Sequence, residues 1–113
     1  MLPYKNRLTK RKDFEKVYKK GTFYALNNLT MKILENDLEE PRIGFVVSLR
    51  FSKKAVERNL AKRQLREIFR SRLENIKKGA DIVVSIRKRE GEKIKFDNLK
   101  ADADELLKRS QLI

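Results

Sequence analysis

Apolar residues along this chain recur at two different spacings, which separate the expected helices from the expected strands. Between residues 10 and 20 they lie on one helical face: Phe14, Val17 and Tyr18. Thr9 is the expected N-cap of this first helix, and Gly21 stands where its C-terminal cap belongs. A last helix is expected from Phe96 or Asp97 to about Arg109, where apolar positions repeat at helical spacing: Phe96, Leu99, Ala103 and Leu106.

Strands are indicated where apolar and polar residues alternate, or where a short run becomes largely apolar. Residues 29–34 alternate as a half-buried strand does, and an acidic turn over 35–41 then favours a hairpin with the segment 42–49. That second strand is richer in apolar and β-branched residues, which predicts a more central place in the sheet. Residues 80–87 form another apolar run and a third expected strand.

The segment between the second and third strands predicts a long basic helix. It is expected to follow a loop at 50–53, to run to about residue 75, and to leave through Lys77-Lys78-Gly79. Helical spacing places four polar side chains in one continuous stripe: Asn59, Arg63, Arg66 and Arg70. A separate apolar arc of the same helix is expected to face a core: Ala61, Leu65, Ile68, Phe69 and Leu73.

The order strand, helix, strand favours a βαβ unit whose two strands lie parallel in one sheet. The basic helix would then pack against a face of that sheet, and its polar stripe would face outward. With 113 residues, of which 40% are hydrophobic, the chain is expected to form a single domain over residues 1–113.

The charge of the chain points to a polyanionic partner. Lys and Arg number 29 against 16 Asp and Glu, which gives a formal net charge of +13. A solvated charged face is the usual meaning of a charge run, but only Glu57 and Glu67 interrupt the cations of the long helix. Basic clusters also alternate with apolar segments along the whole chain, so a folded surface carries the charge. Nucleic-acid phosphate is the expected ligand of the stripe.

The chain contains few of the side chains that commonly act in catalysis. The sequence contains no His and no Cys, so the commonest general base, the commonest metal ligand and the best nucleophile are missing. The four glycines are too dispersed to form a phosphate-binding loop, and no metal site is readable. The chain shows no membrane span and no secretory signal, so a cytoplasmic location is expected.

Three segments resemble the protein subunit of bacterial ribonuclease P, the ribonucleoprotein that matures the 5′ end of transfer RNA. Residues 6–21 carry a basic stretch that leads into Asp13-Phe14 and, four residues after Phe14, Tyr18. Residues 55–67 follow the family's signature of Arg-Asn, then Lys-Arg, then Arg-Glu, and residues 81–88 fit its next strand. Two features depart from the pattern, namely Leu60 in place of a second cation and a loop over 50–54 without the usual glycine.

The resemblance implies a two-layer α/β (α+β) sandwich, similar to one domain of a small-subunit ribosomal protein, with a small mixed sheet and a left-handed βαβ crossover. In that family the RNA subunit hydrolyses the phosphodiester with bound Mg²⁺, while the protein binds this RNA and the 5′ leader of precursor tRNA. The protein alone would therefore bind no cofactor and supply no catalytic residue, and it would stay monomeric until RNA arrives.

Carried onto this sequence, the resemblance assigns two groups of site residues. The group expected to contact the catalytic RNA, with Arg70 added from the helical stripe, is Lys53, Lys54, Arg58, Asn59, Lys62, Arg63, Arg66 and Arg70. The group expected to line a leader-binding cleft between the first helix and the sheet is Phe14, Tyr18, Arg87 and Lys88. An aromatic pair at i, i+4 is also typical of a core, and Arg58 lies near the apolar arc, where a cation can simply anchor the helix start.

Two other classes of protein share this charge pattern. One is a ribosomal or structural RNA-binding protein, and the other is a DNA-binding module that lays the basic helix in a major groove. Binding to ribosomes would favour the first class, and tight binding of duplex DNA the second. A membrane-surface helix is disfavoured because the segment lacks a broad exposed apolar face.

Overall fold

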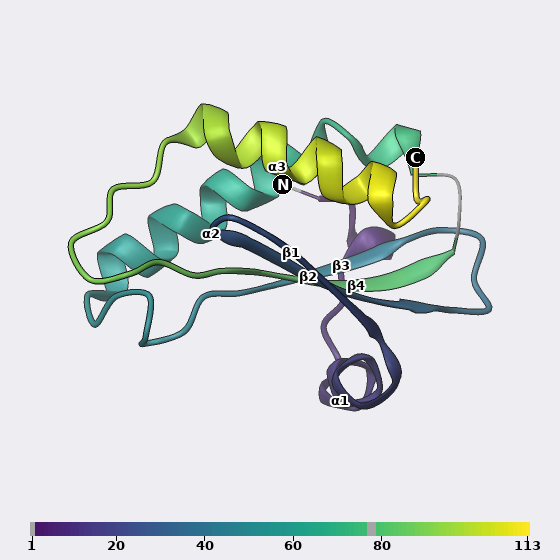
Figure 1. The fold of residues 1–113 in the computed structure, drawn as a ribbon. Helices are drawn as coiled ribbons and strands as arrows, with labels where there is room; N and C mark the ends of the chain where they lie inside the picture. The colour runs from purple at the N-terminus through teal and green to yellow at the C-terminus, as the bar shows by residue number, and fades with distance from the viewer. Residues whose placement is uncertain (1, 77–78) are drawn as a thin grey trace.

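The computed structural model describes residues 2–76 and 79–113, which form a four-stranded sheet with helices on both faces (Figure 1). The elements in chain order are η1 (Tyr4–Asn6), α1 (Arg11–Lys20), β1 (Thr22–Leu26), β2 (Leu29–Glu35), β3 (Arg42–Val46), α2 (Ala55–Arg70), η2 (Leu73–Asn75), β4 (Ala80–Ile86) and α3 (Phe96–Arg109).

The sheet is mixed, and its strand order is β1-β2-β4-β3. β2 pairs antiparallel with β1 and with β4, whereas β3 pairs parallel with β4. The βαβ unit predicted from the sequence is confirmed, since β3, α2 and β4 follow one another and the two strands are parallel neighbours. α2 and α3 cover one face of the sheet, and α1 lies against the other (Figure 1).

Most of the core lies between the sheet and the two longer helices. The predicted apolar arc of α2 faces it, and Ala61, Leu65, Ile68 and Phe69 are all buried. The ring of Phe69 packs against Phe45 of β3, with 5.9 Å between their centroids. The other face of the sheet holds a smaller apolar cluster beneath α1, built on Leu8, Val17 and Val83, with Phe14, Leu34 and Val46 packed against it.

Two predictions about the sheet were wrong. β2 forms its hairpin with β1, an element that was not predicted, and not with β3. The connection is the pair Asn27-Asn28, and Asn27 adopts φ = 52°, a left-handed conformation that Asn tolerates better than most residues. β3 is an edge strand of the sheet, and the two inner positions belong to β2 and β4, of which β4 is buried along nearly its whole length.

The N-terminal end of the first helix differs from prediction, whereas the C-terminal cap at Gly21 is confirmed. α1 has Lys10 at its N-cap position without a side-chain cap, so Thr9 does not cap it. Gly21 is the C-cap, with its backbone N–H bonded to the carbonyl oxygen of Val17 at 2.8 Å, and its φ of −72° lies outside the left-handed region. A Cβ on Gly21 would lie 2.5 Å from the carbonyl oxygen of Val17, so the close approach of the backbone, not a left-handed turn, requires glycine here.

The basic helix also ends earlier than the predicted residue 75. After Arg70, the hydroxyl of Ser71 and the guanidinium of Arg72 both donate hydrogen bonds to the carbonyl oxygen of Ile68, at 2.8 and 2.9 Å. These bonds satisfy a carbonyl that a continuing helix would have used, and a 3₁₀ turn follows. The predicted exit at Lys77-Lys78 lies outside the described residues. α3, by contrast, has the bounds expected from its spacing.

The start of α2 shows how the unusual loop over residues 50–54 is held. The hydroxyl of Ser52 accepts a hydrogen bond from the backbone N–H of Lys54 at 3.1 Å and donates one to Glu57 at 2.8 Å. Arg58 donates a hydrogen bond to the carbonyl oxygen of Ser52 at 2.9 Å. Side chains of the first helical turns therefore fix the loop in place of a glycine turn. Within the described parts of the chain, no helix has the length and hydropathy to cross a membrane.

Candidate nucleic-acid interface

The outward surface of α2 carries the predicted stripe. Asn59, Arg63, Arg66 and Arg70 are exposed, on the side opposite the buried arc. Lys62 is half-buried at the edge of this surface, while Lys53 and Lys54 are exposed just before the helix. Because the cations point away from the core, they are free to meet phosphates without rearrangement of the fold.

Arg58 has a structural contact of its own. Its guanidinium is half-buried and is held by the carbonyl oxygen of Ser52, so this residue anchors the loop to the helix. The guanidinium has five N–H donors, and this bond occupies one of them. Leu60 is exposed, which excludes a role in the core for this departure from the family pattern.

The predicted cation Lys88 lies close to the start of α2. β3 and β4 are parallel, so the loops that follow them emerge at the same edge of the sheet. There the ammonium of Lys88 sits 5.0 Å from the ring centroid of Phe51, in the loop that leads into α2. This cation–π contact joins the β4–α3 loop to the loop that carries Lys53 and Lys54.

Arg87 belongs to an open cleft at the β1–β2 turn. Its side chain donates a hydrogen bond to the carbonyl oxygen of Asn27 at 3.1 Å. The cleft has a volume of about 920 Å³ and a polar lining: Asn27, Asn28, Arg87, Lys88, Arg89, Glu92, Asn98, Ala101 and Asp102. Hydrogen bonds from the Arg89 backbone N–H and the Asn28 amide lower the pKa of Glu92, so cations and a carboxylate share this cleft.

Phe14 and Tyr18 have different surroundings although both lie on α1. Phe14 is half-buried and packs against the cluster of Leu8, Val17 and Val83. It also lines a cavity of about 310 Å³ at the β3 edge, which Arg66 of α2 reaches from the opposite face of the sheet. The side chain of Tyr18 is exposed, with 47% of its surface accessible. The structure thus places Phe14 and Arg66 of the basic stripe along one cavity, while Arg87 lines the separate cleft described above.

Sequence reasoning missed the sheet surface that lies beside α1. The strand register places four small side chains side by side on this face: Ala25, Thr30, Ser85 and Val46. We call these four residues the small-residue row, and all four are half-buried. The alternating residues of the same strands point to the main core. The strand-favouring run Thr22-Phe23-Tyr24 was the available signal, but the row appears only once β1 is recognised as a strand.

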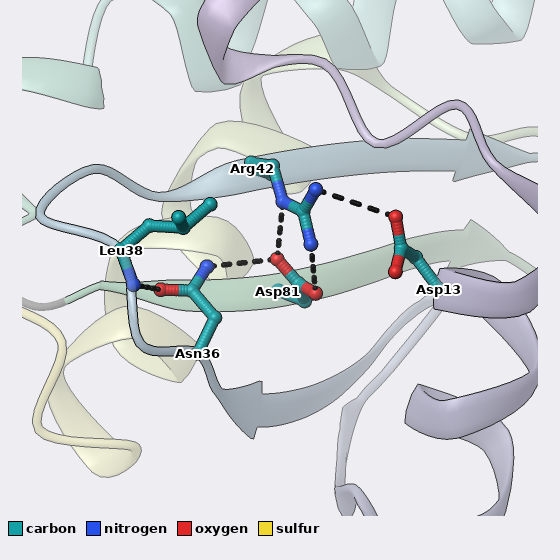
Figure 2. A network of polar contacts seen from close by, with 5 residues as sticks. All are labelled: Asp13, Asn36, Leu38, Arg42 and Asp81. Atoms are coloured by element: carbon teal, nitrogen blue, oxygen red, sulfur yellow. Dashed lines mark hydrogen bonds and ion pairs between the residues drawn. The ribbon is translucent and has the colours of Figure 1, made fainter.

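An ion-pair network fastens the start of α1 to the sheet (Figure 2). Arg42 of β3 donates two hydrogen bonds to the carboxylate of Asp81 in β4, at 2.8 and 2.7 Å. The same guanidinium lies 3.3 Å from the carboxylate of Asp13 in α1. The Asn36 amide donates a further bond to Asp81 at 2.8 Å. Among the residues that the structure describes, no group of three or more acidic side chains is arranged to hold a metal ion.

The fold and this surface define a small, strongly basic α+β protein with a cation-bearing helix between two parallel strands. The sequence profile of the ribonuclease P family matches residues 2–111, and the chain belongs to that family. It is 52% identical over 87 residues to the ribonuclease P protein component of a Pseudanabaena species, with 76% of this chain and 75% of that protein covered.

Two solved structures show the same fold. The RNase P protein from Thermotoga maritima is 38% identical and matches with a TM-score of 0.80, covering 91% of this chain and 96% of that one. The RNase P protein from Staphylococcus aureus is 26% identical and matches with a TM-score of 0.81, covering 95% of this chain and 96% of that one. The α+β class predicted from the sequence is confirmed.

Proposed function

We propose that this chain is the protein subunit of ribonuclease P and supports removal of the 5′ leader from precursor tRNA. Membership of the family supports this function, and the outward cationic surface of α2 is the observation that carries it. The chain acts as one RNA-binding domain in the cytoplasm of a bacterium, where it is monomeric until it meets its RNA partner.

The RNA subunit performs the phosphodiester hydrolysis with Mg²⁺ that the RNA holds. The protein sequence supports this division of labour because it lacks His and Cys, the side chains most suited to base catalysis and nucleophilic attack. The protein contributes positive charge and positioning, and no protein side chain takes part in the bond cleavage.

The catalytic RNA binds along α2 and the loop before it. The contacting residues are Lys53, Lys54, Arg58, Asn59, Lys62, Arg63, Arg66 and Arg70. Most of these contacts are to phosphates, so binding releases counterions and weakens steeply as salt rises. Arg58 serves both purposes, since one N–H bond fixes the loop and its other donors face the RNA.

The 5′ leader of precursor tRNA lies on the sheet face beside α1. Phe14 and Tyr18 flank it on the helix, and the small-residue row leaves room for unpaired nucleotides next to them. Arg87 and Lys88 meet leader phosphates at the edge where β4 ends. Stacking on the exposed Tyr18 ring tolerates any base, which suits leaders of varied sequence.

Reconstitution tests this function. The purified protein is added to the catalytic RNA of the same organism at low Mg²⁺, and leader cleavage of a precursor tRNA is compared with that of each component alone. Cleavage that requires both components supports the proposal. Salt-sensitive binding to that RNA without stimulation of cleavage would instead favour a ribosomal or structural RNA-binding role.

A chelator distinguishes a metal ion that the complex needs for cleavage from one that the protein itself binds. EDTA should abolish cleavage by the reconstituted complex while leaving the melting temperature of the isolated protein unchanged. A fall in the melting temperature of the protein in EDTA would show that the protein itself holds a metal ion.

A further inference from the structure

The network around Arg42 gives the start of α1 its polar attachment to the sheet. Arg42 is held rigidly by its two hydrogen bonds to the buried Asp81, and Asp81 is fixed in turn by the amide of Asn36 (Figure 2). Asn36 accepts a hydrogen bond from the backbone N–H of Leu38 at 3.0 Å. Asp13 therefore meets a guanidinium whose position is set by two strands and a loop.

The apolar attachment of α1 is small by comparison. Val17 is the one fully buried residue among the ten of this helix. The far end of α1 is held by the hydrogen bond from Lys32 to the carbonyl oxygen of Tyr18, and by Gly21, which leads directly into β1. The N-terminal end follows a segment that is bridged to β3 at Arg7 and Ile43 and that buries Leu8 beneath the helix. The pair between Asp13 and Arg42 adds a side-chain attachment between the first turn of α1 itself and β3.

Phe14 follows Asp13 in the sequence, and its ring lies over Gly44. Gly44 is two residues after Arg42 on β3, so both face α1. A Cβ on Gly44 would lie 2.4 Å from Cζ of Phe14, far inside van der Waals contact. The absence of a side chain at Gly44 and the ion pair at Asp13 together determine how close Phe14 comes to the sheet.

We propose that Asp13 is a positioning residue for the 5′ leader: through Arg42 and Asp81 it sets the height of α1 above the sheet, and hence the place of the Phe14 ring. The proposal rests on the proposed function, because it assumes that the leader lies beside α1. Asp13 does not touch the leader, since its carboxylate faces Arg42 and would repel a phosphate.

The test compares Asp13→Ala with Glu15→Ala in the reconstituted complex of protein and catalytic RNA. Both changes remove one carboxylate from α1, but Glu15 is exposed and pairs with Arg11 on the same helix. The affinities for precursor tRNA and mature tRNA are measured for each variant. We expect Asp13→Ala to lower the ratio of precursor to mature affinity about fivefold, as partial loss of one stacked base would. Glu15→Ala should leave the ratio unchanged.

A double-mutant cycle with Phe14→Ala shows whether Asp13 acts through the ring. If it does, Asp13→Ala has no further effect on the affinity ratio once the ring is removed. Additive effects would overturn the proposal, as would an unchanged ratio in Asp13→Ala. An unchanged ratio in Phe14→Ala would instead overturn the proposed leader site, so the two failures are distinguishable.

Gly44→Ala provides a second test that leaves the ion pair intact and applies even if Asp13→Ala fails to fold. The added methyl group displaces the Phe14 ring from the sheet. The expected result is a lowered ratio of precursor to mature affinity with unchanged affinity for the catalytic RNA. An unchanged ratio in a folded Gly44→Ala protein would show that the position of the ring does not matter to the leader.

Discussion

The guanidinium of Arg42 and the carboxylate of Asp81 face each other across two parallel strands and share two hydrogen bonds, at 2.8 and 2.7 Å. The strand register pairs these two residues directly, and the carboxylate is buried while the guanidinium is half-buried. A buried carboxylate needs a partner, because its desolvation is otherwise not compensated. The pair therefore links the edge strand to the central strand, and Asp13 extends the link to α1.

Arg42→Ala should destabilise the protein by about 3 kcal/mol, because among the described residues it leaves the buried Asp81 carboxylate with only the Asn36 amide as partner. Arg11→Ala is the matched control, since Arg11 pairs with Glu15 in full exposure and should cost less than about 0.5 kcal/mol. Urea unfolding gives the free energy of unfolding for both variants. Equal losses would show that the buried pair is no more important than the exposed one.

The double variant Arg63→Ala, Arg66→Ala should weaken binding to the catalytic RNA and reduce the salt dependence of that binding. Each lost phosphate contact lowers the slope of log K against log salt by about one unit. The fold should survive, because both side chains are exposed. Filter binding at several salt concentrations measures the slope.

The control for this double variant is Lys108→Ala with Arg109→Ala, which removes the same charge from the exposed end of α3. It should leave the slope nearly unchanged. A normal affinity and slope in the α2 variant, or an equal loss in both variants, would contradict the assignment of the interface to α2.

Tyr18→Ala and Phe14→Ala should differ in their effect on folding stability, because the two aromatic residues of α1 differ in burial. Tyr18 is exposed, so its loss should leave the melting temperature near that of the parent and weaken precursor tRNA binding more than mature tRNA binding. Phe14→Ala should in addition cost about 2 kcal/mol of folding free energy, because its ring packs in the cluster beneath α1. Thermal unfolding and tRNA binding are measured on the same preparations. Equal losses of precursor and mature tRNA affinity in Tyr18→Ala would assign that residue to packing alone.

The stability of the protein should fall on acidification in part through Asp104. The hydrogen bond from Arg72 lowers the pKa of this carboxyl below its ordinary value of 3.8. The carboxyl is therefore protonated at a lower pH in the folded protein than in the unfolded chain. The stabilisation is complete above about pH 4 and is lost as the pH falls through the lowered pKa. Asp104 is partly exposed, so the effect should stay below about 1 kcal/mol.

The measurement compares urea midpoints of Asp104→Asn and the parent at pH 7 and at pH 2.5. The variant should be less stable at pH 7, and the difference from the parent should shrink at the lower pH, because the parent loses this stabilisation as its carboxyl takes up a proton. A difference that persists undiminished at low pH would contradict the ion-pair origin of the effect.

Local patterns in the sequence predicted the exposed cationic stripe of the proposed interface, which lies on one helix. The stripe of α2 and its buried arc follow from a period of 3.6 residues, which any helix imposes whatever it packs against. The parallel pairing of β3 and β4 was also predictable, since two strands joined by a long helical connection have room to run parallel. The end of α2 was missed because Ser71 and Arg72 stop the helix through side-chain bonds that spacing does not reveal.

The tertiary structure alone decided which strand is central and which residues line the surface beside α1. The turn at Asn27-Asn28 pairs β2 with β1, and this leaves β4 between β2 and β3. Strand order depends on contacts between distant segments, and a sequence pattern records only the burial of each strand, not its neighbour. The meeting of Asp13, Arg42 and Asp81 has the same origin, since these residues lie on three elements. The sequence by itself thus determined the charged face of α2, while only the folded sheet determined where α1 and its aromatic residues stand.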